Sequence, residues 1–236
     1  MGDEGVSIRV NFKQHFPVFP LDSVVLLPHS MLWLYMFEPR YRQLVEESMD
    51  SSGQFAMAVF EGDSWQTEYS GLPPLGRAVC IAQIQQHHKE PSGNHRILVQ
   101  GVCRGRMVEE FSPEGERLYR RARVEPVEPK PTANEELMDV RQELMGMIER
   151  DPLHQLMSCR RVAHELAQRE VPTTALMEVV TLAVLNDKKI QYRLLDEPDV
   201  YRRAGMIGRE LKRLEVILEA AGRQWDPETP KGLSWN

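Results

Sequence analysis

The segment from Phe16 to Glu47, FPVFPLDSVVLLPHSMLWLYMFEPRYRQLVEE, constrains the fold more than any other part of the chain. Its first apolar runs are short, at 16–21 and 24–27, and they are interrupted by residues that break a regular strand ladder. These interrupting residues are Pro20, Asp22 and Pro28. The pattern predicts a series of short strands in place of a long helix.

The same segment then changes from strand to helix. Met31–Phe37 is apolar at every position, which predicts a third strand with both faces buried. Pro39 suits the first position of a helix, because its missing N–H would have no partner there, and Glu38 before it complements the helix dipole. Apolar residues follow at helical spacing. They are Tyr41, Leu44, Val45 and Met49.

Up to about residue 131 the chain continues to alternate short apolar runs with turn residues. The strand candidates are 55–60, 77–84, 96–103, 106–111 and 121–127. Several strands separated by Gly, Pro and Ser predict a closed or folded-over antiparallel sheet. Gly101, in the middle of a strong strand pattern, indicates a bulge or a close approach of another backbone.

Beyond the proline-rich linker 125–133 the apolar period becomes helical. We expect helices at 134–150, 153–170 and 173–186, and a long one from Pro198, with Asn134 capping the first of them. The sequence therefore predicts four segments. They are an N-terminal extension at 1–15, a β-rich subdomain at 16–131, a helical bundle at 132–221 and a flexible tail at 222–236.

The pattern FPLxxVVLxPxxxLxLxxFEPRYRxLVEE resembles the N-terminal substrate-recognition domain of Lon-type proteases. LGRAVCIAQI, ILVQGVCRGRMVEEF and LYRRARVEPVEP are similar to later blocks of that family, and QYRLLDEPDVYRRAGMIGREL to the start of its last helix. The resemblance implies an α+β fold in which a PUA-like pseudo-barrel precedes a helical bundle. It also implies a role in gripping unfolded or extended protein segments, with a protease or an ATPase as a partner.

The composition of the chain limits which cellular compartment and which binding partners we expect. A net charge of −6 and a pI near 5.7 argue against a non-specific nucleic-acid binder. No apolar run reaches the length that spans a bilayer, and the polar N-terminus lacks the layout of a signal peptide. Cys80, Cys103 and Cys159 are odd in number and far apart, which favours free thiols in a reducing cytoplasm.

Near-matches to catalytic motifs lack the residues that do the chemistry. Gly71–Gly76 has the spacing of a phosphate-binding loop, but Arg77 and Ala78 stand where lysine and a hydroxyl are needed. His164 begins a zinc-protease-like pattern in which Gln168 replaces the second histidine. We therefore predict no catalytic residues, no cofactor and no enzymatic activity.

A histidine trio, His87, His88 and His95, flanks a predicted hairpin turn. Three imidazoles can bind zinc, but adjacent residues of a strand point to opposite faces, so at most two of the three converge. We interpret the trio as a solvated hairpin tip and predict no metal site.

Four residues are candidates for protein binding. Arg40 and Tyr41, beside Glu38, form either a recognition patch or a structural group that fixes the helix to the barrel. Trp65 and Tyr69 lie in a polar loop, where aromatic side chains are either tucked onto the fold or left as binding anchors. The predicted function is a non-catalytic protein- or peptide-binding module, an adaptor or regulator of proteolysis. An RNA-binding PUA-like module is the alternative.

Overall fold

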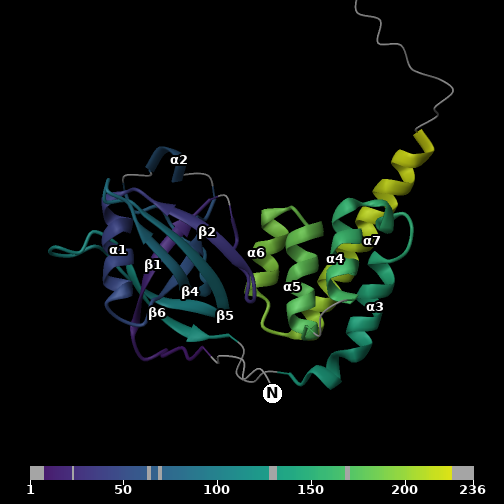
Figure 1. Ribbon diagram of the computed structural model, residues 1–236, viewed down its shortest axis with the longest axis horizontal. Coiled ribbons are helices and arrows are strands. Elements are labelled where there is room, and N and C mark those ends of the chain that lie inside the picture. The colour runs from purple at the N-terminus through teal and green to yellow at the C-terminus, as the bar shows by residue number, and fades with distance from the viewer. Residues whose placement is uncertain are drawn as a thin grey trace, which may run out of the picture. The chain divides into compact units, whose positions relative to one another are not determined.

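In the computed structural model, the chain folds into two compact units, which Figure 1 shows as ribbons. It describes residues 8–22, 24–62, 65–68, 71–127, 132–167 and 171–224. The first unit comprises the described residues up to 127 together with Asp187–Asp199, and the second comprises the rest. Within the part of the chain that is described, no helix is both long and apolar enough to cross a membrane.

The first unit is built on a six-stranded mixed sheet that closes on itself (Figure 1). Its strands are β1 (His15–Leu21), β2 (Met31–Met36), β3 (Gln54–Val59), β4 (Ala78–Lys89), β5 (His95–Phe111) and β6 (Arg121–Pro126). The strand order is β2-β5-β4-β3-β1-β6, and β5 also pairs with β6. Five strands therefore form a ring, and β2 lies outside it. This arrangement confirms the expected α+β class with a barrel-like first half. The sheet was expected to be antiparallel, and this was wrong for β1 and β3, which pair in parallel.

Gly101 lies where β5 bends. Ile81 pairs with Cys103 and Ala82 with Gly101, so Val102 is an extra residue and forms a bulge. A Cβ atom on Gly101 would lie 2.1 Å from the carbonyl oxygen of Leu27. The structure thus contains both features that the sequence suggested for this glycine, a bulge and a close backbone approach. The run 24–27, predicted as a strand, is irregular but buried, and it brings Leu27 to this contact.

Strand β2 has one buried and one exposed face, so the expectation that both faces are buried was wrong. Leu34 and Met36 are buried, whereas Met31, Trp33 and Tyr35 are exposed. The cause is the position of β2 in the sheet order, because among the described strands it pairs with β5 alone. One face of β2 covers the core of the unit and the other has no layer above it in this unit.

The second unit is helical. Its elements are η1 (Asn134–Leu137), α3 (Met138–Ile148), η2 (Leu153–Gln155), α4 (Met157–Ala167), α5 (Thr173–Val184) and α7 (Val200–Gln224). The apolar seam of α7 buries Ala204, Ile207 and Leu211. Asn134 does not cap its own helix. Its side-chain oxygen accepts hydrogen bonds of 2.8 Å from the backbone N–H and the hydroxyl of Thr173, and so satisfies a free N–H at the start of α5.

Helix α6 (Lys188–Asp196) lies in the first unit, whereas the sequence analysis had the bundle continue from 132 to 221. It contacts β4 and β5. The Tyr192 hydroxyl accepts a hydrogen bond of 3.0 Å from the Ala78 N–H, and Arg106 pairs with Asp196 at 2.5 Å. The sequence analysis predicted no helix at 188–196, because it placed helices only at 173–186 and from Pro198 onward. Of the expected tail, residues 225–236 lie outside the described residues.

The histidines of the β4–β5 hairpin form a partly buried pair. His87 Nε2 lies 2.7 Å from His95 Nδ1, while the His88 side chain is exposed. His95 is fully buried and its Nε2 lies 3.5 Å from Glu46, which also accepts a hydrogen bond of 2.6 Å from Lys89. The expectation of a solvated tip was therefore wrong for His95. No three potential metal ligands gather within the described ranges.

The pKa of His95 is lowered, because burial disfavours the imidazolium form. The neighbouring His87 disfavours it as well, to a smaller extent. Lys89 acts in the same direction, while Glu46 opposes it. The hydrogen bond from Lys89 lowers the pKa of Glu46, so that carboxylate titrates below its ordinary range. The hairpin therefore favours a neutral His95.

Replacing Gly101 by alanine is expected to lower the free energy of unfolding by at least about 2 kcal/mol, because the new methyl group overlaps the Leu27 carbonyl. Gly146→Ala is the matched control. Nothing lies within 4 Å of a Cβ at this position in α3, so the gain in helix propensity should stabilise the protein slightly. Urea denaturation of both variants measures the difference. Equal stability of the two would contradict the close approach.

The stability of the protein is expected to fall as the pH is lowered from about 7 to about 5, because a histidine in the unfolded chain takes up a proton near pH 6.5. Folded His95, whose pKa is lowered, takes up its proton only at a lower pH, so acid favours the unfolded state. His95→Gln should flatten this part of the pH profile of unfolding. His88→Gln, at an exposed position of the paired strand β4, should leave the profile unchanged. Equal slopes for the wild type and His95→Gln would overturn the assignment.

Candidate functional site

The exposed face of β2 is an apolar strip. Met31, Trp33 and Tyr35 alternate with inward-facing residues, and Phe37 follows directly after the strand. Their side chains are 48–61% exposed. The rings of Tyr35 and Phe37 lie 6.3 Å apart, so the strip is continuous at its end. Large apolar side chains exposed together on one strand are typical of an interaction surface.

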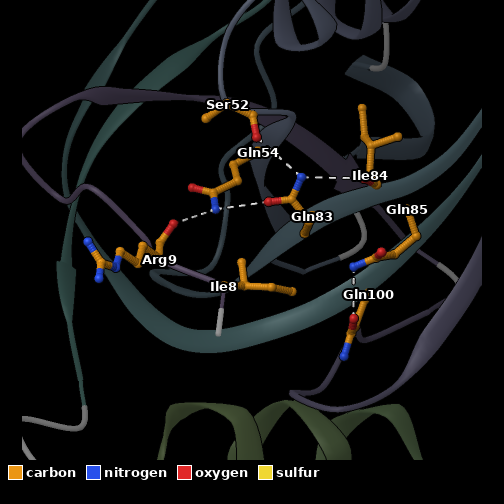
Figure 2. A pocket seen from close by; sticks show the side chains of 8 residues that line it. All are labelled: Ile8, Arg9, Ser52, Gln54, Gln83, Ile84, Gln85 and Gln100. Carbon is orange, nitrogen blue, oxygen red and sulfur yellow. Dashed lines mark hydrogen bonds between the residues drawn. The ribbon is translucent and has the colours of Figure 1, made fainter. Parts of the chain in front are cut away.

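A row of glutamines crosses the sheet beside this strip. The strand register places Met31 opposite Gln100, Gln100 opposite Gln83, and Gln83 opposite Gln54. Residues directly opposite each other point to the same face of a sheet. Figure 2 shows a pocket of about 480 Å³ in this region. It is lined by Ile8, Arg9, Ser52, Gln54, Gln83, Ile84, Gln85 and Gln100.

The glutamine side chains are linked in pairs (Figure 2). Gln54 Nε2 donates to Gln83 Oε1 at 3.0 Å and to the backbone oxygen of Arg9 at 2.9 Å. Gln85 Nε2 donates to Gln100 Oε1 at 2.8 Å. An amide side chain offers the same donor and acceptor groups as a peptide bond. Gln54 is buried, so the groups of this kind that face solvent beside the apolar strip belong to Gln85 and Gln100.

Sequence reasoning did not identify this site. Every residue of Met31–Phe37 is apolar, so alternation of exposed and buried positions is invisible there. The available signal was the strand that carries Gln83, Gln85 and Gln86, where several amides follow an apolar run. Only the register shows that Gln83 and Gln86 face the same side as Trp33.

Trp65, predicted as a binding anchor, lies in the short helix α2 (Trp65–Glu68) and is partly buried. Its ring stacks on Phe60, with centroids 5.4 Å apart and planes inclined by 12°. Trp65 also lines a groove of about 650 Å³ together with Leu75 and Tyr192. Tyr69, the second predicted anchor, lies outside the described residues.

Arg40 and Tyr41, the other two candidates, attach α1 (Pro39–Met49) to the sheet. Tyr41 is buried and meets Phe19 edge-on, with centroids 4.7 Å apart. Arg40 pairs with Glu38 at 2.9 Å and lies over the Tyr41 ring. Tyr41 is buried in the core, and the structural interpretation of this pair accounts for its contacts.

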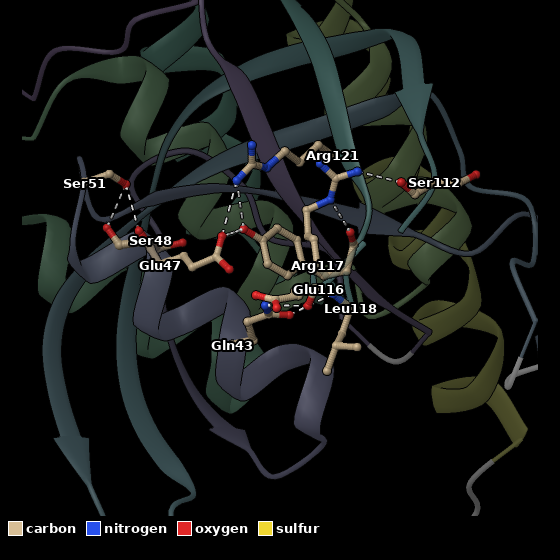
Figure 3. Close-up of polar contacts among 10 residues, drawn as sticks. Gln43, Glu47, Ser48, Ser51, Ser112, Glu116, Arg117, Leu118 and Arg121 are labelled. Atoms are coloured by element: carbon tan, nitrogen blue, oxygen red, sulfur yellow. Dashed lines mark hydrogen bonds and ion pairs between the residues drawn. The ribbon is translucent and has the colours of Figure 1, made fainter. Parts of the chain in front are cut away.

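A second polar group on α1 is also structural (Figure 3). Glu47 accepts hydrogen bonds from the Tyr119 hydroxyl and, at 3.3 Å, from Arg121. Burial raises the pKa of the Tyr119 hydroxyl, so it stays protonated and acts as a donor. Gln43 bonds to the backbone of Glu116 and Leu118. These contacts fix α1 to the segment that precedes β6.

In the loop that resembles a phosphate-binding motif, backbone groups are hydrogen-bonded to other backbone groups of the protein. The Gly76 N–H donates to Val59 and the Glu61 N–H to Pro74, both at 2.9 Å. A Cβ atom on Gly76 would lie 2.2 Å from the Tyr192 hydroxyl, so this glycine makes room for α6. The loop thus leads into β4, as predicted. In α4, the zinc-protease-like pattern starts at His164, but its Gln168 lies outside the described residues.

The cysteines show no sign of activation among the described contacts. All three are free thiols, and Cys80 and Cys159 are buried. Burial raises the pKa of the Cys159 thiol, which disfavours the nucleophilic thiolate.

Comparison with known proteins identifies the family. Residues 15–213 match the family model described as the ATP-dependent protease La (LON) substrate-binding domain. The Lon protease of Escherichia coli strain K12 is 30% identical over 106 residues, which cover 45% of this chain and 13% of that protein. The Lon protease of Heliobacterium modesticaldum is 29% identical over 101 residues, which cover 43% of this chain and 12% of that protein. The chain therefore spans only about an eighth of these relatives.

Solved structures show the same fold. The N-terminal domain of Mycobacterium avium complex Lon protease superposes with a TM-score of 0.62 at 19% identity and covers 84% of this chain and 98% of that one. The Lon N-terminal domain protein from Xanthomonas campestris gives a TM-score of 0.52 at 20% identity, with 82% and 96% covered. Because the family model spans most of the chain, from the first strand into the last helix, this protein belongs to the family of LON substrate-binding domains.

Proposed function

We propose that this protein is a non-catalytic module that captures extended, apolar segments of client proteins and acts as an adaptor or regulator of proteolysis. The proposal is carried by one observation, the exposed apolar strip of Met31, Trp33, Tyr35 and Phe37 on β2. The family description, a substrate-binding domain of a protease, supports protein segments as the ligand. The three free thiols support the cytoplasm as its compartment.

The strip suits unfolded segments because burial of apolar surface is favourable without requiring a particular partner geometry. Each square ångström of apolar surface removed from water contributes roughly 25 cal/mol, and aromatic side chains dominate such contacts. A folded client has few contiguous apolar residues on its surface, whereas an unfolded one exposes many. The strip therefore selects for the unfolded state of a client.

The glutamine row gives the same surface a way to hold the backbone of the client. Gln85 and Gln100 line the pocket in Figure 2, and Gln85 is exposed while Gln100 is partly exposed. Hydrogen bonds to peptide groups do not depend on the client's side chains. A surface that combines the two binds many different sequences in an extended conformation.

The variant Trp33→Ser/Phe37→Ser is expected to bind an unfolded client more than about tenfold more weakly, because it removes the two most accessible rings of the strip. It leaves Tyr35 and its hydrogen bonds to Glu90 and Asn94 in place. Reduced, carboxymethylated lactalbumin, which cannot refold, serves as the client in a fluorescence anisotropy titration.

Val216→Ser/Ile217→Ser is the matched control for this experiment. Both residues are large, apolar and more than half exposed, but they lie on α7. The control should bind the client as the wild type does. The proposal fails if the control weakens binding as much as the strip variant, or if the strip variant keeps its affinity while its thermal unfolding is unchanged.

The purified protein is expected to hydrolyse neither ATP nor casein. Arg77 and Ala78 replace the lysine and hydroxyl of a phosphate-binding loop, and the loop's own backbone bonds hold Glu61 and Gly76. Release of phosphate from ATP and of acid-soluble peptides from casein measures the two activities. Turnover that co-purifies with the protein through successive columns, and is lost in an Arg77→Ala variant, would show that the protein is an enzyme.

A further inference from the structure

We propose that the groove beside Trp65 is a second binding site, which takes an acidic segment of a protein chain with an apolar side chain at its centre. The groove lies within the first unit, at the surface of β3, the loop that follows it, and α6. It is separate in sequence from the apolar strip on β2, and none of the strip residues lines it.

The floor of the groove is apolar and held in place. Phe60 forms a β-bridge with Leu75, and Trp65 stacks on Phe60. On the other wall, Tyr192 is fixed by the hydrogen bond from the Ala78 N–H, and Gly76 leaves room for its ring. The site therefore offers a preformed apolar surface between two aromatic side chains.

The rim of the groove is mainly basic. Among the described residues that line it, four are cationic and two carry carboxylates. The cations are Arg77, Lys188, Lys189 and Arg193, and the carboxylates are Asp22 and Glu61. This excess of positive charge occurs in a chain whose net charge is −6.

Three of the four cations have no carboxylate partner in the described part of the chain. Arg77, Lys189 and Arg193 are exposed and form no ion pair there, whereas many other arginines of this unit do. Lys188 donates to the backbone oxygen of Asp22 at 3.1 Å. Unpaired cations around an apolar floor are complementary to Asp or Glu residues that flank an apolar side chain.

A protein segment fits the charges of this groove better than RNA does. Asp22 and Glu61 share the rim with the cations, and they would repel a phosphate at every nucleotide of an RNA strand. A peptide can place neutral or basic residues beside them. The mixed rim therefore suits a chain whose charges vary along its length.

The test uses the full chain and three fluorescein-labelled peptides of the same length. Each has a central Leu-Phe pair, flanked by Asp and Glu in the first, by Asn and Gln in the second, and by Lys in the third. Fluorescence anisotropy should show the acidic peptide bound about tenfold more tightly than the amide peptide, and the difference should shrink as salt is added. Binding of the amide peptide with equal affinity would overturn the proposal.

Lys189→Glu/Arg193→Glu should weaken binding of the acidic peptide about tenfold or more, because two attractive charges become repulsive. Arg209→Glu/Lys212→Glu, a reversal of two exposed cations on α7, is the matched control and should have no effect beyond the change in net charge. Lys189→Gln/Arg193→Gln, which adds no repulsion, should give a smaller loss. Equal losses in the control and the groove variant would contradict the site.

Two further measurements distinguish binding in this groove from binding on the apolar strip and from RNA binding. Trp33→Ser/Phe37→Ser should bind the acidic peptide normally. If that variant loses the peptide and the groove variant does not, the groove assignment fails while the apolar strip stands. A labelled oligouridine that binds more tightly than the acidic peptide, and is released by Lys189→Glu/Arg193→Glu, would show that the groove is an RNA site.

Discussion

The first unit depends on a single long strand that pairs with three others. The first residues of β5, His95–Gln100, pair with β2, and its last, Gly105–Phe111, pair with β6, while β4 follows it on the other side. The strand must bend between these two partners. The bulge at Gly101–Cys103 lies between them, and a Cβ atom on Gly101 would meet the Leu27 carbonyl at 2.1 Å. Because β5 turns toward β6, the ring closes without β2, and the outer face of β2 is left uncovered within this unit.

Patterns that depend on local spacing could be predicted from the sequence, and those that depend on a distant partner could not. The helix after Pro39, the bulge at Gly101 and the apolar seam of α7 follow from neighbouring residues. The exposed side of Met31–Phe37 does not, because the run is apolar throughout and only the sheet order decides which side is covered. Helix α6 has an ordinary amphipathic pattern, and the contacts of Tyr192 and Asp196 decide that it packs on the sheet.

For the candidate binding residues too, local spacing could be read from the sequence, but contacts with distant partners could not. Tyr41 was chosen for its polar neighbours, but its ring fills the space beside Phe19. His95 was placed at a solvated turn, but the register of the hairpin turns it inward, beside His87 and Glu46. His95 was expected at an exposed position, whereas a recognition patch and a structural role were both left open for Tyr41. The residues that cover each side chain, Phe19 of β1 for Tyr41 and His87 and Glu46 for His95, come from elsewhere in the sequence. Trp65 was predicted in a loop, whereas it begins the short helix α2, and its contact with Phe60 and its place in the groove beside Tyr192 required the structure.

The two proposed sites would contribute differently to the binding of a client. Apolar contact on the β2 strip supplies affinity in proportion to the area buried and discriminates little between sequences. The charged rim of the Trp65 groove contributes less affinity for each contact, but it disfavours a segment of the wrong charge. Both sites belong to the same unit, since α6 contacts β4 and β5. A client that has an apolar stretch and an acidic stretch would therefore gain from holding both at once, because the second contact forms at the high effective concentration set by the first. Selectivity for such clients then arises from the pairing of two weakly selective surfaces, and neither surface needs to recognise a specific sequence.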